Sequence, residues 1–161
     1  MDECILSLAL PIQEVDPLSS LPVLAQQDNF RFLWDLAPKS SFAAAGQCQH
    51  LDLLGPGRFD LAQRFSDDTF KQIIDASLEA PIYALPRILF SFTFFDQLKE
   101  FKTDLQEPHT VQAILPKWQL SFQNNIAWLR INSLVSDESD AREMAEHLWV
   151  MYERILKIPS L

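Results

Sequence analysis

Hydrophobic and polar positions alternate with a period of two in several short segments, a pattern typical of β-strands with one buried face. The clearest case is ILFSFTFF at residues 88–95, where Phe90, Phe92 and Phe94 alternate with smaller polar residues. This segment predicts a central strand in a large aromatic core, with Phe92 buried. Similar patterns predict strands over residues 4–12, 29–36, 42–48 and 50–54, the last two separated near Gly46.

Residues 111–122 and 126–135 carry the strongest hairpin pattern, with Gln123-Asn124-Asn125 as a polar turn between them. Asn tolerates a positive φ, so we expect an antiparallel hairpin that turns at Asn124-Asn125. Trp118 lies on the alternating first strand and is predicted to be buried. One face of the hairpin is expected to pair Trp118, Leu120 and Phe122 with Ile126, Trp128 and Arg130.

Three segments show helical signals instead. Asp16-Pro17 reads as an N-cap followed by proline at the first helical position, which predicts a short helix to about Gln26. Apolar residues recur at helical spacing from Arg58 to about Leu78, with Asp67-Asp68 as a candidate break. A final helix is predicted over 137–157, before Pro159, and its apolar stripe comprises Ala141, Met144, Ala145, Leu148, Trp149, Tyr152, Ile155 and Leu156.

The connections between these elements complete the fold class. We expect residues 55–57 to form a glycine-proline turn, Pro81 and Pro86 to bracket a loop, and the polar residues 97–109 to form a surface loop. The order of strands, helix, strands and helix, with antiparallel hairpins, predicts an α+β fold of mostly antiparallel sheets with flanking helices. We expect residues 1–161 to form a single domain.

Composition and charge narrow the class of protein. Hydrophobic residues make up 48% of the chain and charged residues 22%, as in ordinary globular proteins. The net charge of -9 argues against nucleic acids and anionic membrane surfaces as partners. No secretory signal is expected, because Met1-Asp2-Glu3 is acidic where a signal is basic. Cys4 and Cys48 are expected to be buried thiols in a reducing cytoplasm.

Candidate chemistry is sparse. Three glycines provide no phosphate-binding loop, and no serine lies in a G-x-S-x-G sequence. Glu143 and His147, with Glu146 beside them, are one helical turn apart and could form part of a metal site, but a solvated helix face is favoured. Arg87 and Lys117 could each bind a carboxylate, although a rim position is favoured for both. The remaining histidines, His50 and His109, are widely spaced. Cys48-Gln49-His50 alternates between the two faces of a strand, so its side chains do not converge easily on one metal ion.

Five segments in order carry a family resemblance: VDPL at 15–18, FRFLWD at 30–35, FAAAGQCQHL at 42–51, FSFTFFD at 90–96 and AILPKWQL at 113–120. Together they resemble the N-terminal half of isochorismate synthase, a chorismate-utilising enzyme, and are most similar to the cyanobacterial type. Two positions depart from the family pattern, since Ser91 stands where glycine is expected and Lys117 where arginine is usual.

The resemblance implies a fold of two packed, mostly antiparallel sheets enclosed by helices, of which this chain supplies half. Phe90, Phe92 and Phe94 would then line one inner face, and some apolar surface of this half would be exposed or covered by another chain. The implied reaction is the Mg²⁺-dependent conversion of chorismate to isochorismate in menaquinone, phylloquinone or salicylate biosynthesis. In the family, the lysine base, the glutamate acid and the Mg²⁺ ligands lie in a C-terminal half with a KVVLAR strand.

No segment of the 161 residues resembles that strand. We therefore assign no catalytic, cofactor-binding or metal-binding residue in this chain, and expect it to be inactive alone. Three interpretations stay open at this stage. The chain is a portion of an isochorismate synthase, or a subunit of a split enzyme that pairs with a separate catalytic chorismate-binding chain, or a stand-alone interaction module that lost the reaction.

Overall fold

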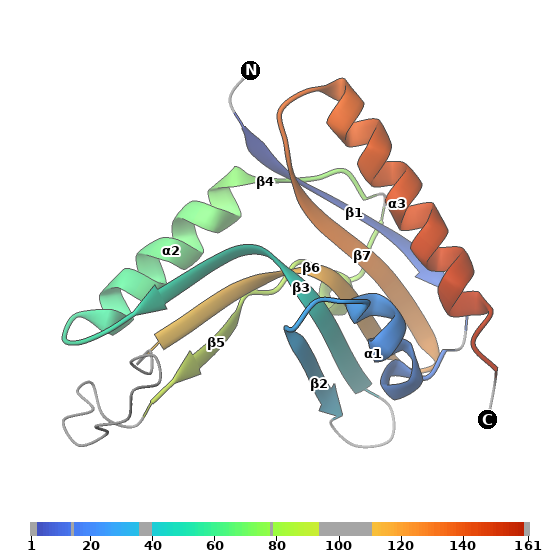
Figure 1. Cartoon of the computed structure of the whole chain (residues 1–161), viewed down its shortest axis with the longest axis horizontal. Helices are drawn as coiled ribbons and strands as arrows, with labels where there is room; N and C mark the ends of the chain where they lie inside the picture. Colours follow the sequence, from blue (N-terminus) through green and yellow to red (C-terminus); the bar gives the residue numbers. More distant parts are fainter. Residues whose placement is uncertain (1–2, 14, 36–39, 78, 94–110, 160–161) are drawn as a thin grey trace.

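A computed structural model describes residues 3–13, 15–35, 40–77, 79–93 and 111–159. Within these residues, seven strands form one sheet in the order β2-β3-β6-β7-β1-β4, and β5 pairs with β6 outside this path (Figure 1). Only β1 and β4 pair in parallel among the described strands. The expected α+β class is confirmed. The strands are β1 (Cys4–Ile12), β2 (Arg31–Asp35), β3 (Ser40–Leu53), β4 (Ile73–Asp75), β5 (Leu89–Phe92), β6 (Val111–Gln123) and β7 (Ile126–Val135).

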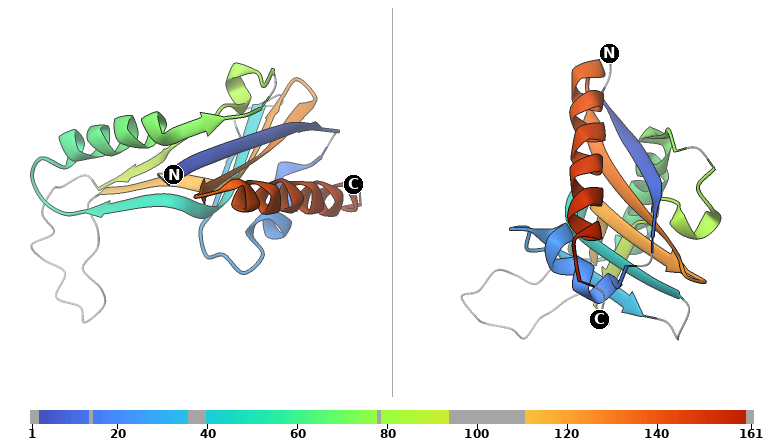
Figure 2. Two further views of the ribbon diagram at one scale, coloured as in Figure 1. Left: turned by 90° about the horizontal axis from the view of Figure 1, so that it is seen from above. Right: turned by 90° about the vertical axis from the view of Figure 1, so that its right-hand side faces the viewer.

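The helices are α1 (Pro17–Ala25), α2 (Arg58–Gln72), α3 (Glu138–Leu156) and the short 3₁₀ helix η2 (Ile82–Ala84). Figure 2 shows α2 and α3 on opposite faces of the sheet. Among the described residues, no helix is both long and apolar enough to span a membrane. The sheet therefore has two differently covered faces, and only the face under α1 and α3 carries the continuous apolar core.

The β6–β7 hairpin confirms the strongest structural prediction from the sequence. Asn124 and Asn125 have φ values of 51° and 68°, so both positions of the two-residue turn are left-handed. Asn is one of the few residue types that adopt this conformation at low cost. Trp118, at 5% exposure, is buried in the core as predicted.

The predicted pairing across this hairpin was wrong by one residue. The two-residue turn pairs Gln123 with Ile126, which places Leu120 opposite Leu129. A shift of one residue moves every side chain of a strand to the other face. Arg130 therefore lies on the face opposite Trp118, away from the apolar core.

Helices α1 and α3 cover the apolar face of the sheet. The Asp16 side chain caps α1 by accepting a hydrogen bond from the Ser19 backbone N–H at 2.9 Å, as the Asp-Pro sequence predicts. The Asp137 side chain caps α3 in the same way. The core beneath them comprises Ile12, Leu24, Ala25, Ala43, Ala45, Trp118, Leu120, Ala127, Leu129, Ile131, Val135, Met144, Leu148, Met151 and Ile155.

The apolar stripe of α3 is narrower than the sequence suggested. Met144 and Leu148 are buried as expected, and Met151 joins them on the same face. Trp149 is 56% exposed, because it lies one position after Leu148 and points about 100° away from the sheet. The nearby Tyr152 ring stacks on it at 5.3 Å.

Strand β3 is continuous from Ser40 to Leu53, which corrects the prediction of two separate strands. The irregularity near Gly46 is real but smaller than a break, since the register with β6 shifts between Gln47 and Gln49. Gly46 has a φ of +71°, and a Cβ there would lie 2.8 Å from Asp28 Oδ2. Glycine at this position therefore permits a bulge within one long strand.

Helix α2 differs from its predicted form in two ways. It runs through Asp67-Asp68 without a break, and it ends at Gln72 rather than near Leu78, which lies outside the described residues. Ile73 and Ile74 instead begin β4, which pairs in parallel with β1. Two adjacent β-branched residues favour a strand, and the free edge of β1 provides the hydrogen-bonding partner.

The aromatic strand is peripheral, which overturns its predicted central position. β5 covers only Leu89–Phe92 and pairs with Val111–Ile114 of β6, and Phe94 lies outside the described residues. Phe90 and Phe92 are each 41% exposed, so the prediction that Phe92 is buried was wrong for this chain. The alternation correctly placed both rings on one side of a strand, but no described element covers that side completely.

Candidate functional site

The second face of the sheet is held together by buried polar groups. Arg130 is 1% exposed, and its Nε donates to the Ala84 carbonyl at 2.8 Å. Its Nη1 donates to Ser7 Oγ at 2.6 Å and pairs with Asp75 Oδ1 at 3.1 Å. Burial lowers the pKa of Arg130, while the hydrogen bond and charge of Asp75 oppose that shift. Arg130 thus ties β7 to β1, β4 and η2.

Two amides extend this polar layer toward the β5 side. Gln119 Oε1 accepts the Arg87 backbone N–H at 3.0 Å, and its Nε2 donates to the Leu85 carbonyl at 3.3 Å. Asn132 Nδ2 donates to the Pro116 carbonyl at 2.9 Å, close to where β6 and β7 stop pairing. The two Gln119 bonds fix residues 85–87 over the sheet, which decides where Arg87 lies.

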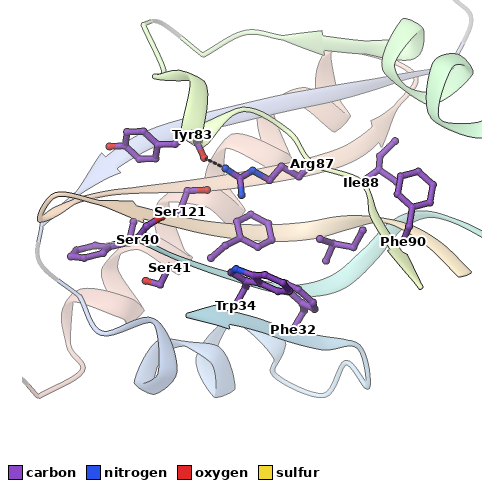
Figure 3. Close-up of a pocket in the computed structure, with 12 residues that line it drawn as sticks. Phe32, Trp34, Ser40, Ser41, Tyr83, Arg87, Ile88, Phe90 and Ser121 are labelled. Atoms are coloured by element: carbon purple, nitrogen blue, oxygen red, sulfur yellow. Dashed lines mark hydrogen bonds between the residues drawn. The ribbon is translucent and has the colours of Figure 1, made fainter. Parts of the chain in front are cut away.

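A pocket of about 440 Å³ opens between this segment, the first half of β3 and β2 (Figure 3). Six aromatic side chains, one cation and three serines line it. Its size lies within the ordinary range of small-molecule sites, and no described lining residue is acidic. The lining residues are Phe32, Trp34, Ser40, Ser41, Phe42, Tyr83, Arg87, Ile88, Leu89, Phe90, Ser121 and Phe122.

Arg87 is the charged group of the pocket. Its Nη2 donates to the Tyr83 carbonyl at 3.1 Å, and its Cζ lies 4.9 Å from the centroid of the Phe42 ring. A guanidinium this close to an aromatic face is held by a cation–π interaction. None of the described ion pairs involves Arg87, so its charge is not neutralised by a carboxylate of the described chain.

An aromatic surface lies beside the pocket, and we define it as Phe59, Phe90 and Phe92. The Phe59 and Phe92 rings stack at 5.0 Å, and the Phe90 and Phe92 rings stack at 5.9 Å. Phe59 lies in the first turn of α2 and is 59% exposed. Phe90 also lines the pocket. Stacked, half-exposed aromatic rings of this kind mark interaction surfaces.

Comparison with known families identifies the chain at the level of its family. Residues 1–160 match the family described as chorismate binding enzyme. The chain belongs to the chorismate-binding enzyme family. A comparison with curated proteins gives no match. The match confirms the resemblance to chorismate-utilising enzymes, while isochorismate synthase and the cyanobacterial type stay predictions.

The metal candidates from the sequence do not assemble into a site. His147 Nε2 lies 3.8 Å from Glu143 Oε1 on α3, and the two side chains are 54% and 68% exposed. Within the described residues, no group of three or more His, Cys, Asp or Glu side chains could hold a metal ion. The resemblance to isochorismate synthase implies Mg²⁺, but the part of the chain that the structure describes has no fitting ligand set for it, and we assign it no step.

The other sequence candidates are dispersed over the molecule. Lys117 borders a separate depression next to His147, away from the pocket of Arg87. His50 is exposed on β3, and His109 lies outside the described residues. Cys4 and Cys48 are free thiols as expected, but both are partly rather than fully buried. Burial raises the pKa of Cys48 to about 11.

Sequence reasoning found Arg87 but missed the residues that position it. The missed residues lie at the positions of β6 and β7 that face away from the apolar core, where polar residues are ordinarily expected to be exposed. They are Gln119, Arg130 and Asn132. A two-residue turn at 124–125 would have placed them together on one face. The coverage of that face by residues 79–88 has no comparable signal, because it depends on tertiary packing.

Proposed function

We propose that this chain is the N-terminal scaffold portion of an isochorismate synthase, forming a single domain over residues 1–161. The reaction is the conversion of chorismate to isochorismate, as in menaquinone or phylloquinone biosynthesis. Family membership over residues 1–160 supports the chorismate-utilising class, and the five ordered segments support the specific reaction. The two free thiols fit a cytoplasmic location.

The observation that carries the proposal is the aromatic surface. Phe59, Phe90 and Phe92 stack on one another yet stay 41% to 59% exposed. Completing the burial of a Phe ring contributes about 1–2 kcal/mol, so three such rings form an energetically strong docking area. In the proposed enzyme this surface is covered by the catalytic portion, which supplies the general base, the general acid and the metal ligands.

The chain alone is expected to give no turnover above background. Each positioned general acid or base typically contributes about 10²–10⁴-fold to a rate, and the proposal gives both to the catalytic portion. The assay uses purified chain, chorismate and Mg²⁺, coupled to an enzyme that consumes isochorismate. Turnover by a preparation free of the host's own synthase contradicts the scaffold assignment.

A second assay tests the role of the aromatic surface. A separately expressed catalytic portion of an isochorismate synthase is added to the chain, and activity is measured against its concentration. The variants Phe59→Ser and Phe92→Ser should each weaken this complementation about 5- to 30-fold. Trp149→Ser is the matched control, because Trp149 is about as exposed as Phe59 but lies on α3 across the sheet.

The outcome separates an enzyme scaffold from an interaction module. Complementation that depends on Phe59 and Phe92 supports the scaffold portion, whether the catalytic portion is joined to this chain or separate. Stable binding of the catalytic portion without turnover favours an interaction module. If all three variants complement as well as the unaltered chain, the aromatic surface is not the docking area.

A further inference from the structure

The pocket beneath residues 83–90 contains a cation whose position is fixed from three sides. The Arg87 backbone is held by Gln119, and its guanidinium by the Tyr83 carbonyl and the Phe42 ring. Within the described residues, the Arg87 guanidinium makes one hydrogen bond, from Nη2 to the Tyr83 carbonyl. Its other N–H donors are therefore available to a ligand. A guanidinium with free, preoriented donors is suited to an oxyanion.

Ser121 provides a second polar group in the pocket. Its side chain lines the pocket and the residue is 3% exposed, yet its hydroxyl makes no hydrogen bond within the described residues. The hydroxyl is not one of the fully buried unpaired atoms of the described chain, so it is open to the pocket and can both donate to and accept from a ligand. Figure 3 shows Ser121 on the same side of the sheet as Arg87. The floor of the pocket therefore offers a second hydrogen-bonding group beside the cation.

The opposite wall is flat and aromatic. The Phe32 and Trp34 rings stack at 6.4 Å with an interplanar angle of 15°, and Phe32 meets Phe42 edge-on at 6.1 Å. Trp34 is 52% exposed, so its ring offers free surface. Such a wall favours a planar, apolar body, since aromatic pairs gain from offset stacking.

We propose that this pocket binds a small monocarboxylate with a planar unsaturated ring, the carboxylate on Arg87 and the ring along the Phe32–Trp34 wall. The volume of about 440 Å³ accommodates one or two rings. The described lining contains no carboxylate to pair with an ammonium group, which disfavours amino acids as ligands. This site goes beyond the proposed function, because it needs neither a catalytic portion nor turnover.

The test uses benzoate and 2-naphthoate as probes, with benzamide and acetate as controls that lack the charge or the ring. Binding is followed by NMR through the indole N–H signal of Trp34, which a Trp34→Phe variant identifies among the four tryptophans. Both aromatic carboxylates should shift this signal saturably. Acetate and benzamide should bind at least about tenfold more weakly, because each loses one half of the recognition.

Two substitutions assign the contacts. Arg87→Gln should weaken benzoate binding about tenfold or more, since a charge-assisted hydrogen bond is lost. Ser121→Ala should weaken it about two- to tenfold. Lys117→Gln removes the same charge outside the pocket and should leave binding unchanged.

Three results overturn the proposal. They are equal affinity for benzamide and benzoate, unchanged affinity of Arg87→Gln, and no saturation up to about 10 mM probe. If Arg87→Gln fails to fold, the comparison of benzoate with benzamide on the unaltered chain still decides the matter. None of these measurements depends on isochorismate formation, so they stand apart from the outcome of the activity assays.

Discussion

Replacing Arg130 with methionine should destabilise the chain more than any surface charge substitution. The guanidinium makes three close polar contacts, to the Ala84 carbonyl at 2.8 Å, Ser7 Oγ at 2.6 Å and Asp75 Oδ1 at 3.1 Å. Methionine fills much of the same space but satisfies none of these groups. The variant therefore leaves buried acceptors and a partly buried carboxylate without their donor.

The expected loss is about 3–5 kcal/mol, the usual cost of removing one partner of a buried ion pair. Three charge-assisted hydrogen bonds at about 1.5–3 kcal/mol each set an upper bound. Two effects reduce it. Burying the guanidinium is itself costly, and Nη2 has no hydrogen-bond partner within the described residues. We therefore expect the lower end of the range, which is still a large part of a typical domain stability of about 5–15 kcal/mol.

The measurement is urea unfolding followed by far-UV circular dichroism and tryptophan fluorescence. Arg142→Met is the matched control, because Arg142 pairs with Glu138 at 2.7 Å while both side chains are more than three-quarters exposed. An exposed pair of this kind contributes at most about 0.5 kcal/mol. A loss below about 1 kcal/mol in Arg130→Met, or an equal loss in the control, refutes the assigned role of the network.

The remaining predictions concern the core, the bulge, the network and a thiol. Trp118→Ala should cost about 3–5 kcal/mol in urea unfolding, because the indole is buried in the core, and a loss under about 1 kcal/mol contradicts this. Gly46→Ala should cost more than Gly55→Ala, since both have positive φ but only the Cβ at 46 would meet Asp28 and Lys117; equal losses contradict the crowding. Burial raises the pKa of Asp75, but the hydrogen bonds from Ser77 and Arg130 outweigh burial, so the net pKa lies below the usual 3.8. The folded chain thus binds this proton less tightly than the unfolded chain, so the stabilisation is present above about pH 4 and is lost as the pH falls below it, and Asp75→Asn should flatten this acid-side slope. Cys48 should react with iodoacetamide at pH 8 about 100-fold more slowly than free cysteine, since its pKa is about 11, and denaturant should abolish the difference.

Local patterns predicted most of the elements, because the signals involved are local. The Asp16 and Asp137 caps, the Asn124-Asn125 turn and the alternation around Trp118 each depend on residues within a few positions of one another. The fold class followed from their order. Errors arose where the outcome depends on a distant partner, as at Ile73, where the free edge of β1 converts the end of a helical pattern into β4.

The hairpin shows how a small local error changes the view of the site. A turn counted as three residues instead of two exchanges the two faces of β7 relative to β6. The incorrect register put Arg130 in an apolar cluster and hid the polar layer that Gln119 and Asn132 form with it. With the correct register, polar residues fall together on one face, and a buried arginine there indicates a network rather than a solvent contact.

The aromatic strand shows a different limit. Period-two alternation specifies that Phe90 and Phe92 share one side of a strand, but it does not specify what covers that side. In the described chain the cover is incomplete, and both rings are 41% exposed. The burial signal in the sequence and the exposed rings in the structure agree if protein beyond the described residues covers Phe90 and Phe92. The proposed function requires such a cover.

The pocket and the aromatic surface are positioned by one segment. Gln119 binds the Leu85 carbonyl and the Arg87 backbone N–H, so it fixes the chain immediately before β5. Arg87 enters the pocket from this segment, and Phe90 and Phe92 follow it within five residues. A ligand that contacts Arg87 and a partner that covers Phe92 therefore act on the same short stretch of backbone. If both exist, occupancy of one site should alter affinity at the other by the same factor in either direction, because such coupling is reciprocal. Loosening the segment through Gln119 should weaken both together, whereas Ser121→Ala should affect the ligand alone.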